Sequence, residues 1–173
     1  MSSIAVNIIV LLIKGIPEGM LAVLALHLFT RTKLHPKKYL FLSFIYIAAT
    51  YLIRFLPIAL GVNTVLSLFV LIISFQLTYK TQLSQMIRAI VSSAVVLITI
   101  AISEVINMLG LIAIYGQSKA ESMFTSQDGL IKSISTTPTN LIFALFMLIG
   151  YLILKKIDKR KLDNGETGTK TGT

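Results

Sequence analysis

The chain contains no cysteine and very little charge. Without cysteine it has no disulfide, no thiolate metal site and no cysteine nucleophile. Only 13% of its 173 residues are charged and 55% are hydrophobic, whereas a soluble domain carries about 25% charged residues. So few charges cannot cover a water-facing surface of this size. The composition therefore indicates that lipid is the solvent for much of the chain.

The sequence also lacks the common catalytic motifs. It has no HExxH, GxSxG or P-loop motif, and no His or Asp lies at a motif spacing that would activate a serine. The two histidines, His27 and His35, have no clustered carboxylates beside them, so no metal site is expected. We expect His27 to face a neighbouring helix. The protein is predicted not to be an enzyme and to need no cofactor.

Long apolar runs dominate what is present. A spanning helix needs about 20 residues, and about five runs approach or exceed this length, at 4–29, 39–56, 64–79, 89–115 and 138–154. They predict an all-α fold, a polytopic transmembrane helical bundle with about five spans. Pro17 should kink the first span. The polar loop 116–137 has room for a short helix around 118–124.

The ends of these runs predict the domain organisation. Residues 1–156 form a single transmembrane helical domain, and residues 157–173 form a basic and then Gly/Thr-rich cytoplasmic tail, which is expected to be disordered. The first run is followed by basic residues and shows no small-residue cleavage site. A cleaved signal peptide is therefore not expected.

Positive charge is concentrated in alternate links. The net charge is +9, and its basic clusters lie at 31–38, 80–88 and 155–161, whereas the links 57–63 and 116–137 are nearly neutral. Basic links favour the cytoplasmic side of a membrane. We therefore expect the N-terminus outside, the C-terminus inside and a multi-pass protein of a cell membrane. Its main partner is the lipid bilayer, not nucleic acid.

Four ionisable side chains lie within or near the spans: Lys14, Glu18, Arg54 and Glu104. Each costs roughly 2.5 to 3.5 kcal/mol at the bilayer centre. Counted from the basic ends at 1.5 Å per residue, they lie about 20 to 26 Å deep, at one level in the outer part of the membrane. We predict an ion pair between Arg54 and Glu104. Lys14 and Glu18 should form a local ion pair with each other or join the Arg54–Glu104 pair in one cluster.

Other polar residues lie on the same helix faces as two of these charged residues. Tyr51 lies on the side of Arg54, and Asn107 lies on the side of Glu104. Such stripes should face the bundle interior, because lipid cannot satisfy them. Asn140 opens the fifth span and could be only a helix cap. Two interpretations of the cluster remain open: a structural ion-pair network, or an outward-facing pocket that binds a ligand. The predicted cluster comprises Lys14, Glu18, Tyr51, Arg54, Glu104 and Asn107.

Two short motifs resemble a known family. They are Lys14-Gly-Ile-Pro-Glu18, and Arg54-Phe-Leu-Pro57 followed by Gly61-Val-Asn63-Thr64. They resemble the membrane sensor region of Firmicutes quorum-sensing-like histidine kinases, whose catalytic part is a GHKL-type ATPase. The resemblance implies an integral membrane sensor that binds an extracellular ligand or peptide and signals to a cytoplasmic or membrane partner. No phosphoacceptor helix or ATP-binding N-box follows 155–161, so we expect a stand-alone or truncated sensor of a bacterial cytoplasmic membrane. Whether a kinase module is missing or supplied in trans stays open.

Two other functions fit the same pattern of spans. Substrate-binding subunits of energy-coupling-factor transporters have a similar size, no ATPase of their own and a pocket near the outer face. They usually have more spans and a small-residue docking motif, which is not evident here. A purely structural membrane protein is the third possibility. A homo-oligomer is compatible with each of these functions.

Overall fold

The computed structural model describes residues 8–53, 60–80, 83–126 and 128–163, and every element in these segments is a helix. The predicted all-α fold is confirmed. Three described helices are long and apolar enough to cross a membrane, namely Ile8–Thr30, Ser84–Tyr115 and Gly129–Arg160, and Val65–Tyr79 is a shorter apolar helix. These lengths support a helical membrane protein.

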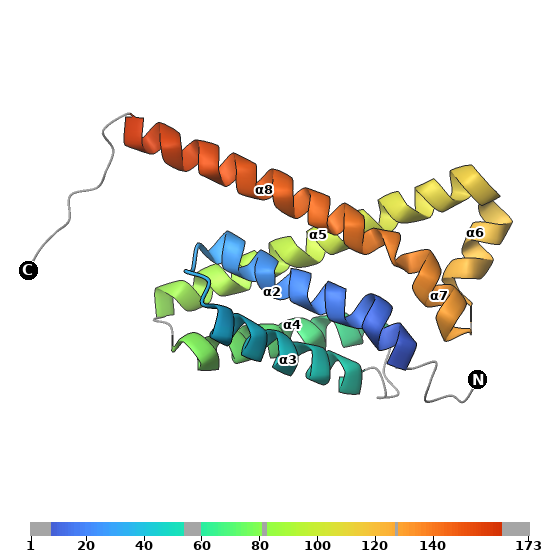
Figure 1. The fold of residues 1–173 in the computed structure, drawn as a ribbon, viewed down its shortest axis with the longest axis horizontal. Helices are drawn as coiled ribbons and strands as arrows, with labels where there is room; N and C mark the ends of the chain where they lie inside the picture. Colours follow the sequence, from blue (N-terminus) through green and yellow to red (C-terminus); the bar gives the residue numbers. More distant parts are fainter. Residues whose placement is uncertain (1–7, 54–59, 81–82, 127, 164–173) are drawn as a thin grey trace, which may run out of the picture.

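The long helices lie side by side and alternate in direction (Figure 1). Two shorter helices, α6 and α7, lie together at one end of the bundle, and α8 continues past the other helices at the opposite end. The elements are η1 (Leu11–Gly15), α2 (Ile16–Thr30), α3 (Pro36–Ile53), α4 (Leu60–Tyr79), α5 (Leu83–Tyr115), α6 (Gln117–Phe124), α7 (Gly129–Thr136) and α8 (Pro138–Asp163).

Helix α2 occupies the centre of the bundle, since it packs against α3, α5 and α8. Val23 and Leu26 of α2 are fully buried and form a core with α3, α4 and α5, whereas Ala22 and Ala25 form a second core with α5 and α8. The outer faces are apolar instead of polar. Phe44, Ile114 and Leu141 each expose more than 70% of their surface. An apolar exterior of this kind is solvated by lipid chains.

Gly19 lets α3 lie directly against α2. A Cβ atom at Gly19 would collide with Cγ1 of Ile47 on α3. Small residues at such crossings allow close backbone approach, which is how helices commonly pack in membranes. Ala22 and Ala25 continue this small-residue character toward α5 and α8. The sequence of α2 is therefore fitted to close contact on several sides.

The first apolar run is not a regular α-helix throughout. Residues Leu11–Gly15 form a π-helix, and Pro17 lies in the first turn of α2 directly after it. Proline has no N–H and its ring clashes with the carbonyl four residues earlier, so a locally widened helix accommodates it. The irregularity that Pro17 predicts thus falls in the preceding turn, which contains Lys14.

The segment 116–137 is more ordered than expected. The short helix predicted around 118–124 is present as α6, and Gly116 separates it from α5 with φ of 80°, a conformation that glycine adopts readily. A second helix, α7, was not expected. It begins after Asp128, whose carboxylate accepts a hydrogen bond from Leu130 N at 2.8 Å and so caps the helix.

Helix α8 extends beyond the predicted fifth span. It continues through the basic residues to Asp163, so residues 157–163 of the expected tail are helical. Residues 164–173 lie outside the described part of the chain, and the division of the chain at residue 156 stays a prediction.

Candidate functional site

Three of the predicted charges come together between α2 and α5. Lys14 belongs to η1, Glu18 lies in the first turn of α2 and Glu104 lies within α5. The Glu104 carboxylate is attracted by Lys14 and repelled by Glu18. We call these three residues the charged cluster. Arg54 lies outside the described residues, so its ion pair with Glu104 stays a prediction.

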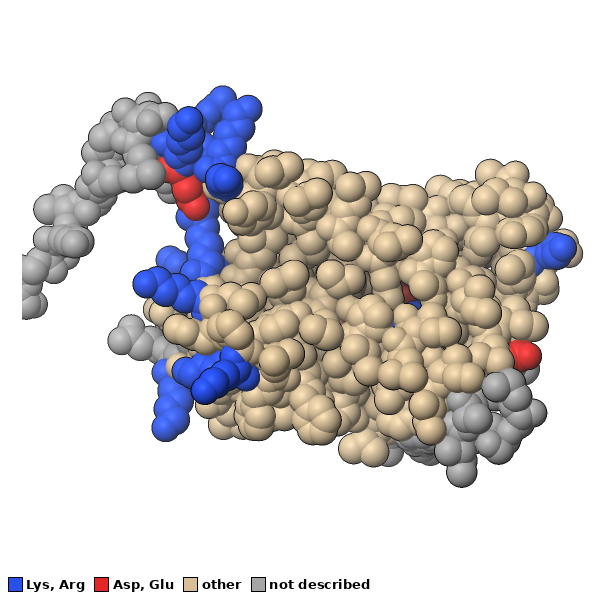
Figure 2. Space-filling view, viewed as in Figure 1, with Lys and Arg blue, Asp and Glu red and all other residues tan. Residues whose placement is uncertain are grey.

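The charges of the described residues are unevenly distributed over the molecule. Figure 2 shows Lys and Arg side chains gathered at one end of the molecule, with only isolated charges at the other end. On this face, charged atoms between the two ends are visible only in a small opening of the apolar surface. Lys14 and Glu18 are half-buried, and Glu104 is exposed at the surface of the bundle. An exposed carboxylate between apolar side chains is costly in lipid, which makes this a functional candidate.

Two buried asparagines connect the cluster region to the last helices. Nδ2 of Asn107 donates to the backbone oxygen of Ser135 in α7 at 2.9 Å, and Nδ2 of Asn140 in α8 lies 3.5 Å from the backbone oxygen of Lys14. Asn107 is therefore a packing residue of the α5–α7 contact. The side chain of Asn140 contacts another helix instead of only capping its own.

Tyr51 lies beside η1. It lines a crevice of about 10 Å³ together with Leu11, Gly15, Ile47 and Thr50. A space of this size holds about one water molecule. Tyr51 thus lies beside Gly15, at the same end of α2 as Lys14, in a crevice too small for a larger ligand. Its place on the face of Arg54 stays a prediction, because Arg54 lies outside the described residues.

His27 forms a separate polar site nearer the basic end. Its Nδ1 lies 2.8 Å from the Val23 backbone oxygen and its Nε2 lies 2.7 Å from the Tyr79 hydroxyl. Because a carbonyl oxygen can only accept, Nδ1 carries the proton and donates it, and in a neutral ring Nε2 then accepts from Tyr79. The rings of Phe75 and Tyr79 surround it edge-on. His27 therefore faces α4, which confirms the prediction that it contacts a neighbouring helix.

The described residues contain no group of three or more His, Asp or Glu side chains arranged to hold a metal ion. The helical fold, its three long apolar helices and the apolar exterior support a helical membrane protein as the class. Comparisons of the chain with protein-family models, curated proteins and solved structures gave no match. The resemblance to kinase sensor regions therefore stays an expectation.

Proposed function

We propose that this chain is a five-span sensor of a bacterial cytoplasmic membrane, with its N-terminus outside and its C-terminus inside, that binds an external ligand or peptide. The observation that supports it most is the approach of Lys14, Glu18 and Glu104. Charges inside a membrane are expensive and are retained mainly at functional sites. A cluster with both signs can recognise a ligand that itself has both signs, such as a peptide or an amino acid.

The local backbone at the charged cluster favours ligand binding over simple packing. Lys14 lies in a π-helical turn, and such turns are frequent at functional sites because they shift side chains out of the regular helical register. The exposed Glu104 leaves one member of the cluster accessible at the surface of the bundle.

Helix α8 supplies the route for the output. Asn140 near its start contacts the backbone of Lys14, and the helix then runs without interruption to Asp163. A ligand that moves the π-helical turn therefore acts directly on the first turn of α8. A shift of a packed helix is a common switching transition. The basic end of α8 would present that shift to a cytoplasmic partner.

The test is ligand-dependent stabilisation of the purified full chain across a panel of peptides and small metabolites. A ligand that raises the unfolding temperature of the native chain should lose most of its effect in Glu104→Gln. The matched control is Glu121→Gln, which removes an exposed carboxylate of α6 outside the charged cluster. No shift with any compound, or equal losses in both variants, would reject the sensing site.

The partner found in the native host separates sensing from transport. Purification at native expression level should recover a kinase or a response regulator with the chain. Recovery of a pair of ATPases would favour the transporter-subunit alternative instead.

A further inference from the structure

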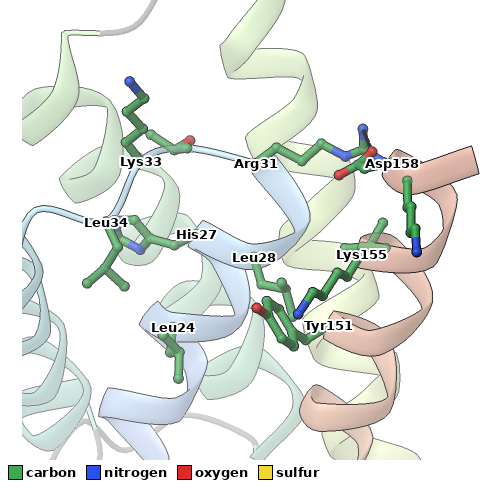
Figure 3. Close-up of a pocket in the computed structure, with 12 residues that line it drawn as sticks. Leu24, His27, Leu28, Arg31, Lys33, Leu34, Tyr151, Lys155 and Asp158 are labelled. Atoms are coloured by element: carbon green, nitrogen blue, oxygen red, sulfur yellow. Dashed lines mark ion pairs between the residues drawn. The ribbon is translucent and has the colours of Figure 1, made fainter. Parts of the chain in front are cut away.

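A groove opens between the last turns of α2 and α8 at the basic end of the bundle. It has a volume of about 710 Å³, which is in the range of ligand-binding pockets. On α2 its lining follows helical spacing through Leu24, Leu28 and Arg31. On α8 the lining follows the same spacing through Tyr151, Lys155, Asp158 and Lys159. Figure 3 shows these side chains on facing helices.

The lining changes in character along the groove. Its deeper part is apolar, with Leu24 and Leu28 facing Tyr151 and Leu154, and its outer part is cationic. Seven residues separate Leu24 from Arg31, a distance of about 10 Å along the helix axis. The groove thus passes from a hydrocarbon surface to a cationic rim within roughly the length of a lipid headgroup and the first part of its chains. The rim comprises Arg31, Lys33, Lys155 and Lys159, with Asp158 as its acidic member.

The carboxylate in the rim does not neutralise it. Asp158 pairs with Arg31 at 3.0 Å, and both side chains are about half exposed. An exposed pair of this kind is weak. Three other cationic side chains of the rim remain as an excess of positive charge. A phosphate that accepts two parallel hydrogen bonds from the Arg31 guanidinium can therefore bind beside or in place of Asp158.

The backbone of Arg31 is the second observation. It ends α2 in a left-handed conformation, with φ of 55° and ψ of 30°. Glycine is the residue favoured at this position of a helix terminus, and a side chain there is strained. The strained backbone places the Arg31 side chain across the mouth of the groove, toward α8 (Figure 3). Residues held in strained backbone conformations cluster at active sites and ligand clamps.

We propose that this groove binds an anionic phospholipid. Its phosphate contacts Arg31, Lys155 and Lys159, and its acyl chains lie against Leu24, Leu28 and Leu154. The occupant is a lipid because the apolar and cationic surfaces are continuous in a helical bundle that lipid surrounds. This lipid site does not depend on the proposed sensing function. It also does not depend on which way the chain is oriented, because the phosphates of both membrane leaflets lie at the same depth from their own surface.

The test is native mass spectrometry of the full chain with phosphatidylglycerol and phosphatidylcholine of identical acyl chains. The native chain should retain phosphatidylglycerol in preference. Lys155→Gln with Lys159→Gln should reduce its affinity roughly 25-fold, because each Lys near an anionic lipid surface contributes a factor of about five. The matched control, Lys37→Gln with Arg88→Gln, removes two exposed charges outside the groove and should change the affinity less than about twofold.

Two further variants test other parts of the proposal. Arg31→Gly shows whether a loss of lipid affinity is caused by unfolding, and Leu24→Trp tests the contact with the acyl chains. Arg31→Gly relieves the left-handed strain, so it should unfold at the same temperature as the native chain or higher while still losing affinity for phosphatidylglycerol. Leu24→Trp fills the apolar part of the groove and leaves its charge unchanged, and it should also weaken binding.

Four results would overturn the proposal. The first is equal loss in the groove and control pairs, which would indicate a general surface attraction. The second is equal retention of the two lipids by the native chain. The third is full competition by water-soluble glycerol phosphate, which would indicate a phosphate site without a lipid. The fourth is a lipid-free dimer that Leu24→Trp abolishes, which would assign the groove to a second copy of the chain.

Discussion

At Gly19 a single hydrogen atom occupies the position that a side chain would take between α2 and α3. Ile47 fills the adjacent space, so any larger residue must push the two helices apart. Gly110 in α5 is the opposite case, since a Cβ atom there has nothing within 4 Å. The two glycines therefore separate the effect of helix propensity from that of helix packing.

We expect Gly19→Ala to destabilise the fold by about 1 to 3 kcal/mol, as overpacking does in a well-packed interior. Gly110→Ala should instead stabilise it by roughly 0.5 to 1 kcal/mol, because alanine loses less conformational entropy in a helix. Reversible unfolding of both variants in mixed micelles, followed by circular dichroism, measures the difference. A stabilised Gly19→Ala variant would mean that α3 can move away from α2 at no cost.

The sequence predicts some residues of the candidate site and not others. Lys14, Glu18 and Glu104 were expected at one depth because helical rise converts residue counts into distance, and the structure brings these three together. The contact of Asn140 with Lys14 joins positions far apart in the chain. No local pattern predicts it, since a polar residue in the first turn of an apolar helix is equally consistent with a cap.

Among the elements, α2 and α4 are joined by a half-buried polar contact. The Tyr79 hydroxyl donates to His27, and Lys38 of α3 lies over the Tyr79 ring, 5.0 Å from its centroid. A polar pair between helices in lipid contributes about 0.6 kcal/mol on average and up to about 1.7 kcal/mol. This contact therefore fixes the register of α4 more than it stabilises the whole bundle.

Tyr79→Phe should reduce stability by about 1 kcal/mol, because it leaves the buried Nε2 of His27 without its donor. Tyr115→Phe is the control, since Tyr115 is exposed and also has a lysine over its ring, Lys119 at 5.4 Å. That change should be close to neutral. In a His27→Phe background, Tyr79→Phe should cost little, and a double-mutant cycle in detergent measures this coupling. Equal effects of the two tyrosine changes would contradict the assigned hydrogen bond.

The elements differ in how well hydrophobicity predicts them. The long helices were expected because uninterrupted apolar runs need internal backbone hydrogen bonds in lipid. Helix α7 was missed because its serine- and threonine-rich sequence is typical of a loop, although Ser133, Ser135 and Thr136 are buried. The cap at Asp128 was the available local signal. The groove between α2 and α8 was not predictable, because its two sides meet only in the folded bundle.

For the whole molecule, the distribution of charge predicts orientation. Basic side chains gather at the end where α2 and α8 terminate (Figure 2), and the end with α6 and α7 has few charges. Because the chain contains no cysteine, single substitutions provide unambiguous labelling sites. The exposed residues Lys37, Gln85 and Lys159 represent the basic end, and Lys119 represents the other.

In intact cells, a membrane-impermeant maleimide should label Lys119→Cys and leave Lys37→Cys, Gln85→Cys and Lys159→Cys unmodified, because basic segments are retained in the cytoplasm. Permeabilised cells should show labelling at all four positions, which serves as the control for accessibility. Modification of Lys37→Cys or Lys159→Cys in intact cells would indicate the opposite orientation of the chain. Labelling of Gln85→Cys alone would contradict the number of spans.

Helix α8 connects the end of the bundle that contains α6 and α7 with the basic end (Figure 1). Its 26 residues extend over about 39 Å at 1.5 Å per residue, and near its midpoint a Cβ atom at Gly150 would lie 3.5 Å from the ring of Phe29 on α2. A tilt of about 10° about Gly150 displaces each end of α8 by roughly 3 Å. Asn140 and the basic end of α8 lie at similar distances from Gly150, so a movement near Asn140 is carried to the basic end at about its original size.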